Sequence, residues 1–201
     1  MSAPEFHTVT RPELTLPPAE TAWLSAMYAA APVILEYGSG GSTVLAAEMP
    51  GKTLFSVESD QEWAAMMAAY FQAHPPAAQV HLHPVNIGAT GKWGAPAGNG
   101  GWRRYHLYPL SVWDREDFVH PDLILIDGRF RAACLLTALM RAERPVTVLF
   151  DDDAERKRYH RVERWVERAE TRGRMARFEV FPGTLPKRDL TEILSIFTMQ
   201  Q

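Results

Sequence analysis

Short runs typical of β-strands alternate with helical segments, and this alternation constrains the fold more than any other feature of the sequence. One run, Leu-Ile-Leu-Ile at residues 123–126, is apolar throughout, as expected of a strand buried on both faces. The segments between these runs have apolar residues at helical spacing and residues typical of helix ends, which predicts helices there. The alternation predicts an α/β domain with a mainly parallel sheet. We expect strands at residues 32–37, 53–57, 79–85, 123–126 and 146–150, and helices at 19–31, 43–49, 59–73 and 131–142.

Two details complete this prediction. The S-x-x-E pattern from Ser59 to Glu62 predicts a helix N-cap at Ser59, followed by a buried stripe that starts at Trp63. Asp153 predicts the N-cap of a later helix, because apolar residues follow it at helical spacing. We expect the buried faces of these helices to be Trp63, Met66, Met67 and Tyr70, and Tyr159, Val162, Trp165, Val166 and Ala169; two final strands are expected at 175–181 and 191–199.

Composition narrows the class of protein further. A chain of 201 residues predicts one domain, here residues 19–201, preceded by a Pro-rich arm at residues 1–18. The single cysteine, Cys134, excludes a disulfide framework within the chain. The net charge of −3 gives no reason to expect a nucleic-acid partner, and the apolar runs are too short for a membrane span. With no secretory signal in view, we expect a cytoplasmic protein, and a homo-oligomer is left open.

A glycine-rich turn follows the first predicted strand. Ligands of such sheets bind outside the carboxyl ends of the strands, where glycines let a ligand approach the backbone. The turn reads Gly38-Ser39-Gly40-Gly41-Ser42, and Glu58 lies about 20 residues further on, at the end of the second strand. An acid at this spacing meets the ribose hydroxyls in dinucleotide folds. The pattern indicates a nucleotide-containing cofactor.

The residues Glu36-Tyr-Gly-Ser-Gly-Gly-Ser42 resemble the E/D-x-G-x-G-x-G motif of class I S-adenosylmethionine-dependent methyltransferases. The likeness covers the chain from about Ala31 onward and departs from the motif at Ser42. It implies a Rossmann-like, doubly wound, seven-stranded sheet with an antiparallel last strand at 191–199, plus an N-terminal helix. It also implies that Gly38, Ser39 and Gly40 hold the methionine part of the cofactor, that Glu58 binds both ribose hydroxyls, and that Asn86 and Ile87 border the adenine. The implied cofactor-binding set is Glu36, Tyr37, Gly38, Ser39, Gly40, Ser42, Glu58, Ser59, Asn86 and Ile87.

Acidic residues follow the fourth and fifth predicted strands. Asp127 ends the first of these strands, and Asp151 and Asp152 end the second. Methyl transfer needs a deprotonated acceptor, which either a general base or a divalent cation can supply. This spacing resembles metal-dependent O-methyltransferases of the catechol and macrocin types. Asp127 is therefore the candidate catalytic residue, and Asp127, Asp151 and Asp152 are candidate ligands of Mg²⁺; counter-charges from nearby arginines are the alternative.

The acceptor site is less clearly marked in the sequence. The loop from Gly88 to Tyr108, which has six glycines in residues 88–101 and carries aromatic residues as far as Tyr108, is expected to cover the acceptor. We expect substrate contacts from Trp93, Trp102, Arg129 and Arg131, the two arginines pairing with either an anionic acceptor or the nearby aspartates. The predicted function is methyl transfer from S-adenosylmethionine to a small molecule, at oxygen. A cofactor-binding protein without this catalysis and an NAD-type oxidoreductase are the alternatives.

Overall fold

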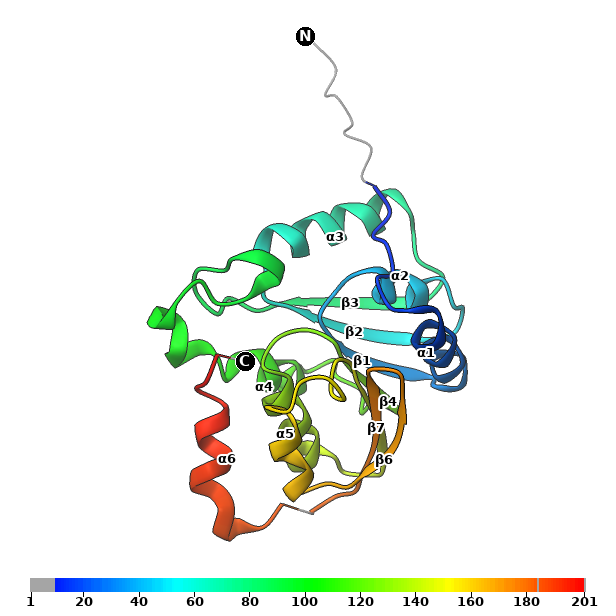
Figure 1. The fold of residues 1–201 in the computed structure, drawn as a ribbon. Helices are drawn as coiled ribbons and strands as arrows, with labels where there is room; N and C mark the ends of the chain where they lie inside the picture. The colour runs from blue at the N-terminus through cyan, green and yellow to red at the C-terminus, as the bar shows by residue number, and fades with distance from the viewer. Residues whose placement is uncertain (1–9, 184, 201) are drawn as a thin grey trace.

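The computed structural model describes residues 10–183 and 185–200, which form a seven-stranded sheet with helices on both faces (Figure 1). The strand order is β3-β2-β1-β4-β5-β7-β6. Strands β1 to β5 pair in parallel, whereas β7 runs antiparallel to both β5 and β6. The predicted Rossmann-like fold class is confirmed. The strands are β1 (Val33–Tyr37), β2 (Thr53–Glu58), β3 (Gln79–Pro84), β4 (Leu123–Ile126), β5 (Val146–Phe150), β6 (Arg168–Arg172) and β7 (Met175–Val180).

Alternate residues of the strands point to opposite faces, and each face has its own core. Ile34 of β1 packs in a cluster with Leu24 and Tyr28, whereas its neighbour Leu35 packs in a second cluster with Leu135. The first face is covered by α1 (Pro18–Ala30), α2 (Gly41–Ala47) and α3 (Gln61–Ala73), and the second by α4 (Leu107–Leu110), α5 (Arg131–Arg141) and α6 (Leu190–Ile196). No described helix is long and apolar enough to cross a bilayer.

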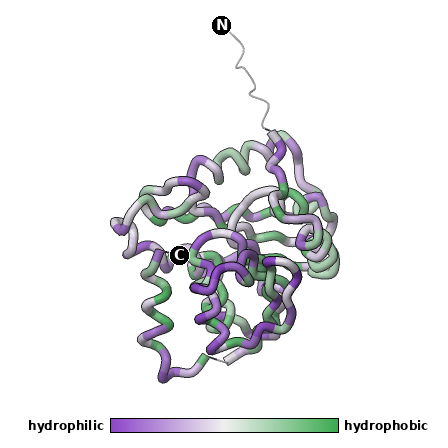
Figure 2. The backbone as a smooth tube through the Cα atoms, viewed as in Figure 1, coloured by the Kyte–Doolittle hydropathy of each residue, from purple (hydrophilic) through white to green (hydrophobic). Residues whose placement is uncertain are grey.

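The helix predicted from Asp153 onward is wrong. The chain instead forms turns, a 3-10 helix (His160–Arg164) and the edge strand β6. Tyr159 and Val162 are buried as expected, but Ala169 is exposed. This hydrophilic segment stands out in purple in Figure 2. Its charged side chains alternate along β6 as on a typical protected edge strand, and Gly173, with φ of +56°, makes the turn into β7. Pairing with β7 therefore overrides the helical spacing.

The strand predicted at 191–199 is also wrong, because this segment contains helix α6. Ile193, Ile196 and Phe197 are buried at the three- and four-residue spacing of a helix that packs on α5. Their β-branched and aromatic side chains suggested a strand. The antiparallel strand of the sheet is instead β7, and β6 supplies the seventh strand.

Two predictions about α3 need correction. The N-cap is Asp60 and not Ser59, since the Asp60 carboxylate accepts from the backbone amides of Glu62 and Trp63. The buried stripe of the helix consists of Ala64, Met67 and Tyr70, and Trp63 lies beside it with its indole 39% exposed. The hydrophobic Trp63 is thereby free to reach the loop after β1.

Candidate functional site

A cavity of about 710 Å³ lies at the carboxyl ends of β1, β2, β4 and β5. It brings the glycine turn, the acid after β2 and the acids after β4 and β5 to one place, as a parallel sheet requires. Part of its wall comes from outside the sheet, namely from the N-terminal arm and the loop after β3. Its lining comprises Glu13–Thr15, Gly38–Ser42, Glu58–Asp60, Trp63, Trp93, Gly94, Tyr108, Asp127–Arg129, Arg131, Asp151, Asp152, Arg156 and Arg174.

Two glycines of the turn after β1 have different roles. Gly38 has φ of +104°, and a Cβ there would lie 2.7 Å from the Cα of Gly128, so the turns after β1 and β4 pack backbone to backbone. Gly40 lines the cavity, and a Cβ at this position would meet no atom within 4 Å. Gly38 therefore serves the fold, and Gly40 keeps open a space at the cavity wall.

Glu36 lies beneath the turn and is fully buried. Its carboxylate accepts hydrogen bonds from the hydroxyls of Ser42, Thr43 and Ser56, the last at 2.9 Å. Burial raises the pKa of Glu36 to about 7, and these hydroxyls oppose the rise. In this arrangement Glu36 holds the turn to the sheet and does not line the cavity.

Glu58 ends β2 with its carboxylate held by backbone amides. Its Oε1 accepts from the amides of Ser59 and Asp60 at 2.7 and 2.8 Å, and its Oε2 accepts from Ser39 at 3.1 Å. Burial raises its pKa, against the effect of these amides. A carboxylate oxygen accepts about two hydrogen bonds, so Oε2 retains capacity for one more donor on the cavity side.

Arg131 binds the turn after β4 to the turn after β5. It is 4% exposed, and its guanidinium donates to the carbonyls of Gly128, Asp127 and Asp151 at 3.0, 3.2 and 2.6 Å. It also lies 3.1 Å from the Asp127 carboxylate. With its donors engaged in this way, Arg131 acts as a structural counter-charge, which favours the second of its two predicted roles.

The aspartates after β5 are paired with arginines as well. Arg174 contacts both carboxylate oxygens of Asp151 at 2.9 Å, and Arg156 contacts Asp152 at 2.6 Å. A magnesium ion needs carboxylate oxygens that are free to coordinate it. Since guanidinium groups already neutralise Asp127, Asp151 and Asp152, the donor set does not fit a metal ion in this arrangement.

Asp127 is the acid of this cluster with the most strongly perturbed protonation. Burial and the nearby Asp151 and Asp152 raise the pKa of Asp127 to about 8, although Arg131 opposes the shift. Its side chain stays 25% exposed to the cavity. A carboxylate with a raised pKa at a cavity wall suits a general base.

A second group of possible metal donors lies beside this cluster. Asp153, His160 and Glu163 place one donor atom each within 4.8 Å of one another. Arg168 already contacts both carboxylates, at 2.9 Å from Asp153. A guanidinium therefore provides the positive charge that a metal ion would bring.

Several residues predicted for the site lie outside the cavity lining. The Tyr37 hydroxyl donates to the carbonyl of Pro109 inside the core. Ile87 is buried, and the Asn86 side chain accepts from Arg104 and from the amide of Gly88. Trp102 is 48% exposed, away from the lining, whereas Trp93 and Arg129 do line the cavity.

Other lining residues were not singled out from the sequence as site residues, although Tyr108 ends the loop that was expected to cover the acceptor. Tyr108 places its hydroxyl between the turns after β1 and β4, where a Cβ on Gly128 would lie 2.1 Å from it. The Trp63 indole donates to the carbonyl of Ser39 at 2.7 Å. The position of Trp63 five residues after Glu58 is a signal that could have indicated this contact. Arg174 follows a hairpin turn at the opposite end of the chain, and no local pattern marks it.

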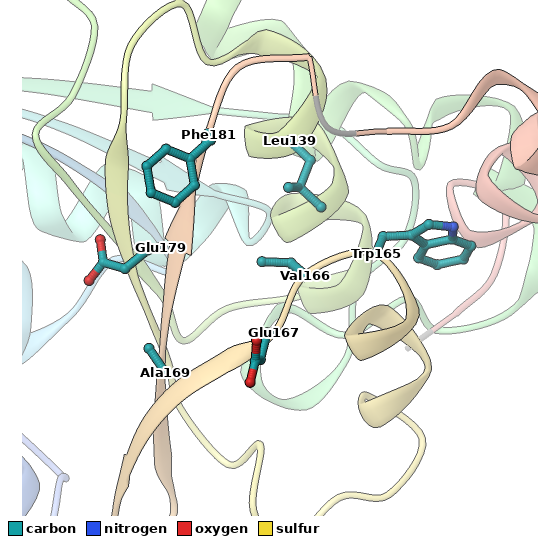
Figure 3. A pocket seen from close by; sticks show the side chains of 7 residues that line it. All are labelled: Leu139, Trp165, Val166, Glu167, Ala169, Glu179 and Phe181. Carbon is teal, nitrogen blue, oxygen red and sulfur yellow. The ribbon is translucent and has the colours of Figure 1, made fainter.

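A second cavity, of about 330 Å³, lies between α5 and the strands β6 and β7 (Figure 3). Leu139, Trp165, Val166 and Phe181 give it apolar walls. Its polar side chains are the glutamates Glu167 and Glu179. The lining of this cavity contains no glycine turn and does not lie at the carboxyl ends of the parallel strands, so the larger cavity is the candidate active site.

The fold and the site together define a class I methyltransferase architecture. The chain is 49% identical to a methyltransferase-like protein from Silicibacter pomeroyi, with 94% of this chain and 98% of that one covered and a TM-score of 0.90. The chain therefore belongs to the methyltransferase-like family within the class I S-adenosylmethionine-dependent methyltransferases. No protein-family model matches the chain, and a comparison with curated proteins finds no match.

Two more distant structures share the fold. The O-methyltransferase TomG from Streptomyces achromogenes, solved with S-adenosylmethionine, is 16% identical, with 85% of this chain and 82% of that one covered and a TM-score of 0.59. An O-methyltransferase from Bacillus cereus, solved with S-adenosylhomocysteine, is 15% identical, with coverages of 83% and 82% and a TM-score of 0.56. At this identity the likeness concerns the fold alone.

Proposed function

We propose that this protein binds S-adenosylmethionine in the larger cavity and transfers its methyl group to an oxygen of a small-molecule acceptor. The observation that carries this proposal is the placement of Gly40 and Glu58 on one cavity wall, the first leaving open space and the second retaining capacity at Oε2. Membership of the methyltransferase-like family supports it.

The residues present fit this cofactor. Oε2 of Glu58 would accept from a ribose hydroxyl, and the open face at Gly40 would admit the methionine part. Since Oε1 of Glu58 already accepts two amide hydrogen bonds, we expect one ribose hydroxyl at Glu58 and not two. When bound, the cofactor supplies an activated methyl group, and the protein contributes position and a base.

Asp127 is the proposed general base for the acceptor hydroxyl. It lies on the cavity wall next to the turn after β1, and its raised pKa matches a task near neutral to mildly alkaline pH. Arg131 fixes its backbone and holds its carboxylate. Because arginines pair with all three aspartates, we propose a metal-free route.

Titration calorimetry tests the cofactor. We expect S-adenosylhomocysteine and S-adenosylmethionine to bind and NAD not to bind. Gly40→Ala should weaken S-adenosylhomocysteine binding, because the new methyl group occupies open space at the wall, whereas Gly98→Ala, also free of neighbours within 4 Å but outside the lining, is the matched control. Binding of NAD with neither adenosyl ligand would contradict the proposal.

Turnover tests the base. On an acceptor found by screening hydroxylated small molecules, Asp127→Asn should lower kcat about 10²-fold or more while the wild-type affinity for S-adenosylhomocysteine is kept. Full activity of this variant would exclude Asp127 as the base. Activity that chelators abolish and Mg²⁺ restores would exclude the metal-free route, and binding without turnover would favour a cofactor-binding protein that lacks this catalysis.

A further inference from the structure

Four arginines line the larger cavity, and they differ in their partners. Three of them make ion pairs with the aspartates after β4 and β5, at distances between 2.6 and 3.1 Å. The fourth, Arg129, has no carboxylate within ion-pair distance in the described part of the chain. The paired arginines are Arg131 with Asp127, Arg156 with Asp152, and Arg174 with Asp151.

The Arg129 side chain is unusual in a second respect. Its Nε is buried and has no hydrogen-bond partner among the described residues. Burial and repulsion from the neighbouring Arg131 lower the pKa of Arg129, although Tyr108, Tyr159 and Asp127 oppose this shift. A partly desolvated guanidinium without a carboxylate at ion-pair distance is unfavourable, so an anion that entered the cavity would supply hydrogen bonds and a paired charge there.

The position of Arg129 separates it from the residues proposed to hold the cofactor. Gly40 and Glu58 belong to the turns after β1 and β2, whereas Arg129 follows β4. Its guanidinium interacts electrostatically with Tyr108, Tyr159 and Asp127. The Tyr159 ring packs on Phe150 of β5 at a centroid distance of 5.2 Å. Strand β5 lies on the far side of β4 from β1 and β2. Arg129 therefore belongs to the half of the cavity left for the acceptor.

We propose that Arg129 binds a carboxylate of the methyl acceptor, so that the substrate class is small organic acids with a hydroxyl group. This inference rests on the proposed function and deepens it. A guanidinium matches a carboxylate with two parallel hydrogen bonds. A phosphate dianion is less suitable, because Asp127, Asp151 and Asp152 surround the site and their own arginines are already committed.

Labelling with an arginine-selective dicarbonyl reagent, read at each arginine by peptide mass spectrometry, tests the proposal on the full-length protein. The probes are acetate and benzoate, their neutral amides acetamide and benzamide, and inorganic phosphate, each with and without S-adenosylhomocysteine. We expect both carboxylates to slow labelling of Arg129 and the amides not to. Arg103, which lies over the Trp102 ring outside the cavity lining, is the internal control and should label at one rate throughout.

Two variants complete the test. In calorimetry, Arg129→Gln should weaken benzoate binding about tenfold or more, and Arg129→Lys should recover part of the loss, while Arg103→Gln should match the wild type. The affinity of Arg129→Gln for S-adenosylhomocysteine should stay within about twofold of the wild type, because the proposal places no bond between Arg129 and the cofactor. Loss of a charge-assisted bond to the cofactor would instead lower this affinity about tenfold.

Three results would overturn the inference. The first is equal labelling of Arg129 with the carboxylates and their amides. The second is protection of Arg129 from labelling by phosphate and not by the carboxylates, which would indicate a phosphorylated acceptor in place of an organic acid. The third is protection by S-adenosylhomocysteine alone together with a tenfold loss of its affinity in Arg129→Gln, which assigns Arg129 to the carboxylate of the cofactor. Failure of the wild type to bind S-adenosylhomocysteine would contradict the proposed function instead, and the probes used without it still report on Arg129.

Discussion

The two halves of the larger cavity stabilise buried carboxylates in different ways. At the ends of β1 and β2, Glu36 and Glu58 accept hydrogen bonds from hydroxyls and backbone amides close to them in the fold. At the ends of β4 and β5, Asp127, Asp151 and Asp152 are paired with guanidinium groups. The first half depends on backbone geometry and the second on long side chains. Substitutions in the two halves should therefore fail in different ways.

The largest effect is expected from Gly38→Ala in the backbone-dependent half. A Cβ there lies 2.7 Å from the backbone of Gly128, and φ of +104° is strained for alanine. We expect a loss of about 3 kcal/mol or more in the free energy of unfolding, measured with urea. Gly40→Ala, which meets no neighbour and has an extended φ of 177°, should unfold like the wild type. Equal free energies of unfolding for the two variants would contradict the assignment of Gly38 to the packing of the fold and of Gly40 to the open space at the cavity wall.

Arg174→Gln tests the half that depends on side chains. The change leaves Asp151, which is 1% exposed, with only the more distant Arg131 as a cation. We expect the variant to lose about 2 kcal/mol in urea unfolding, because a buried charge loses its partner. Arg172→Gln removes an exposed pair with Glu170 and should cost less than about 1 kcal/mol. If both variants lost a similar free energy of unfolding, the pair between Arg174 and Asp151 would contribute no more to stability than an exposed pair.

The stability of the same half should depend on pH through Asp127. Its pKa is about 8 in the folded protein against 3.8 as the ordinary value, so the native state binds the proton more tightly than the unfolded state. The contribution of Asp127 to stability is present below pH 4 and is lost as the pH rises to about 8, at no more than about 1.4 kcal/mol per pH unit.

The charged groups that interact with Asp127 include Arg131, Asp151 and Asp152, and also Arg129 and Arg174. Asp127→Asn cannot release this proton, so urea unfolding at several pH values should show the variant gaining stability relative to the wild type between pH 4 and pH 8. A constant difference over this range would mean that Asp127 is already ionised at low pH.

The smallest effect is expected from Trp63→Phe. The change removes the indole hydrogen bond to the carbonyl of Ser39 and keeps the aromatic surface. Since the side chain is exposed, we expect a loss of about 1 kcal/mol or less in urea unfolding. Phe71→Leu on the same helix, where no hydrogen bond is removed, is a comparison for the packing change. If Trp63→Phe lost more free energy of unfolding than Arg174→Gln, the hydrogen bond from Trp63 to Ser39 would be a main contribution to the stability of the glycine turn.

The sequence predicts the first half of the site better than the second. The glycine turn and Glu58 are close to consecutive strands, so local patterns place them, and the sheet from β1 to β5 follows from the same alternation. Arg174 reaches Asp151 only because β7 pairs with β5, a contact that no local pattern encodes. The helix predicted after Asp153 is wrong for the same reason, since strand pairing across a hairpin overrides local spacing.

Short-range ambiguity accounts for the remaining errors. Residues 191–199 combine β-branched residues with a helical burial pattern, and their packing on α5 decides the outcome. Ser59 and Asp60 are both good N-caps, and Ser59 hydrogen bonds elsewhere, with its hydroxyl donating to the carbonyl of Gly94. Such choices depend on neighbours that are distant in the sequence.

The N-terminal arm gives this cavity a wall that is separate from the sheet. A Cβ on Gly41 would lie 2.3 Å from the backbone of Glu13 and Leu14, so glycine at this position lets the arm lie directly on the glycine turn. Replacing side chains at residues 13–15 would reshape the cavity beside the glycine turn without altering a strand. Because Gly41 has no side chain, part of the cavity wall is built by a segment whose side chains can be changed without disturbing the strands or the glycine turn.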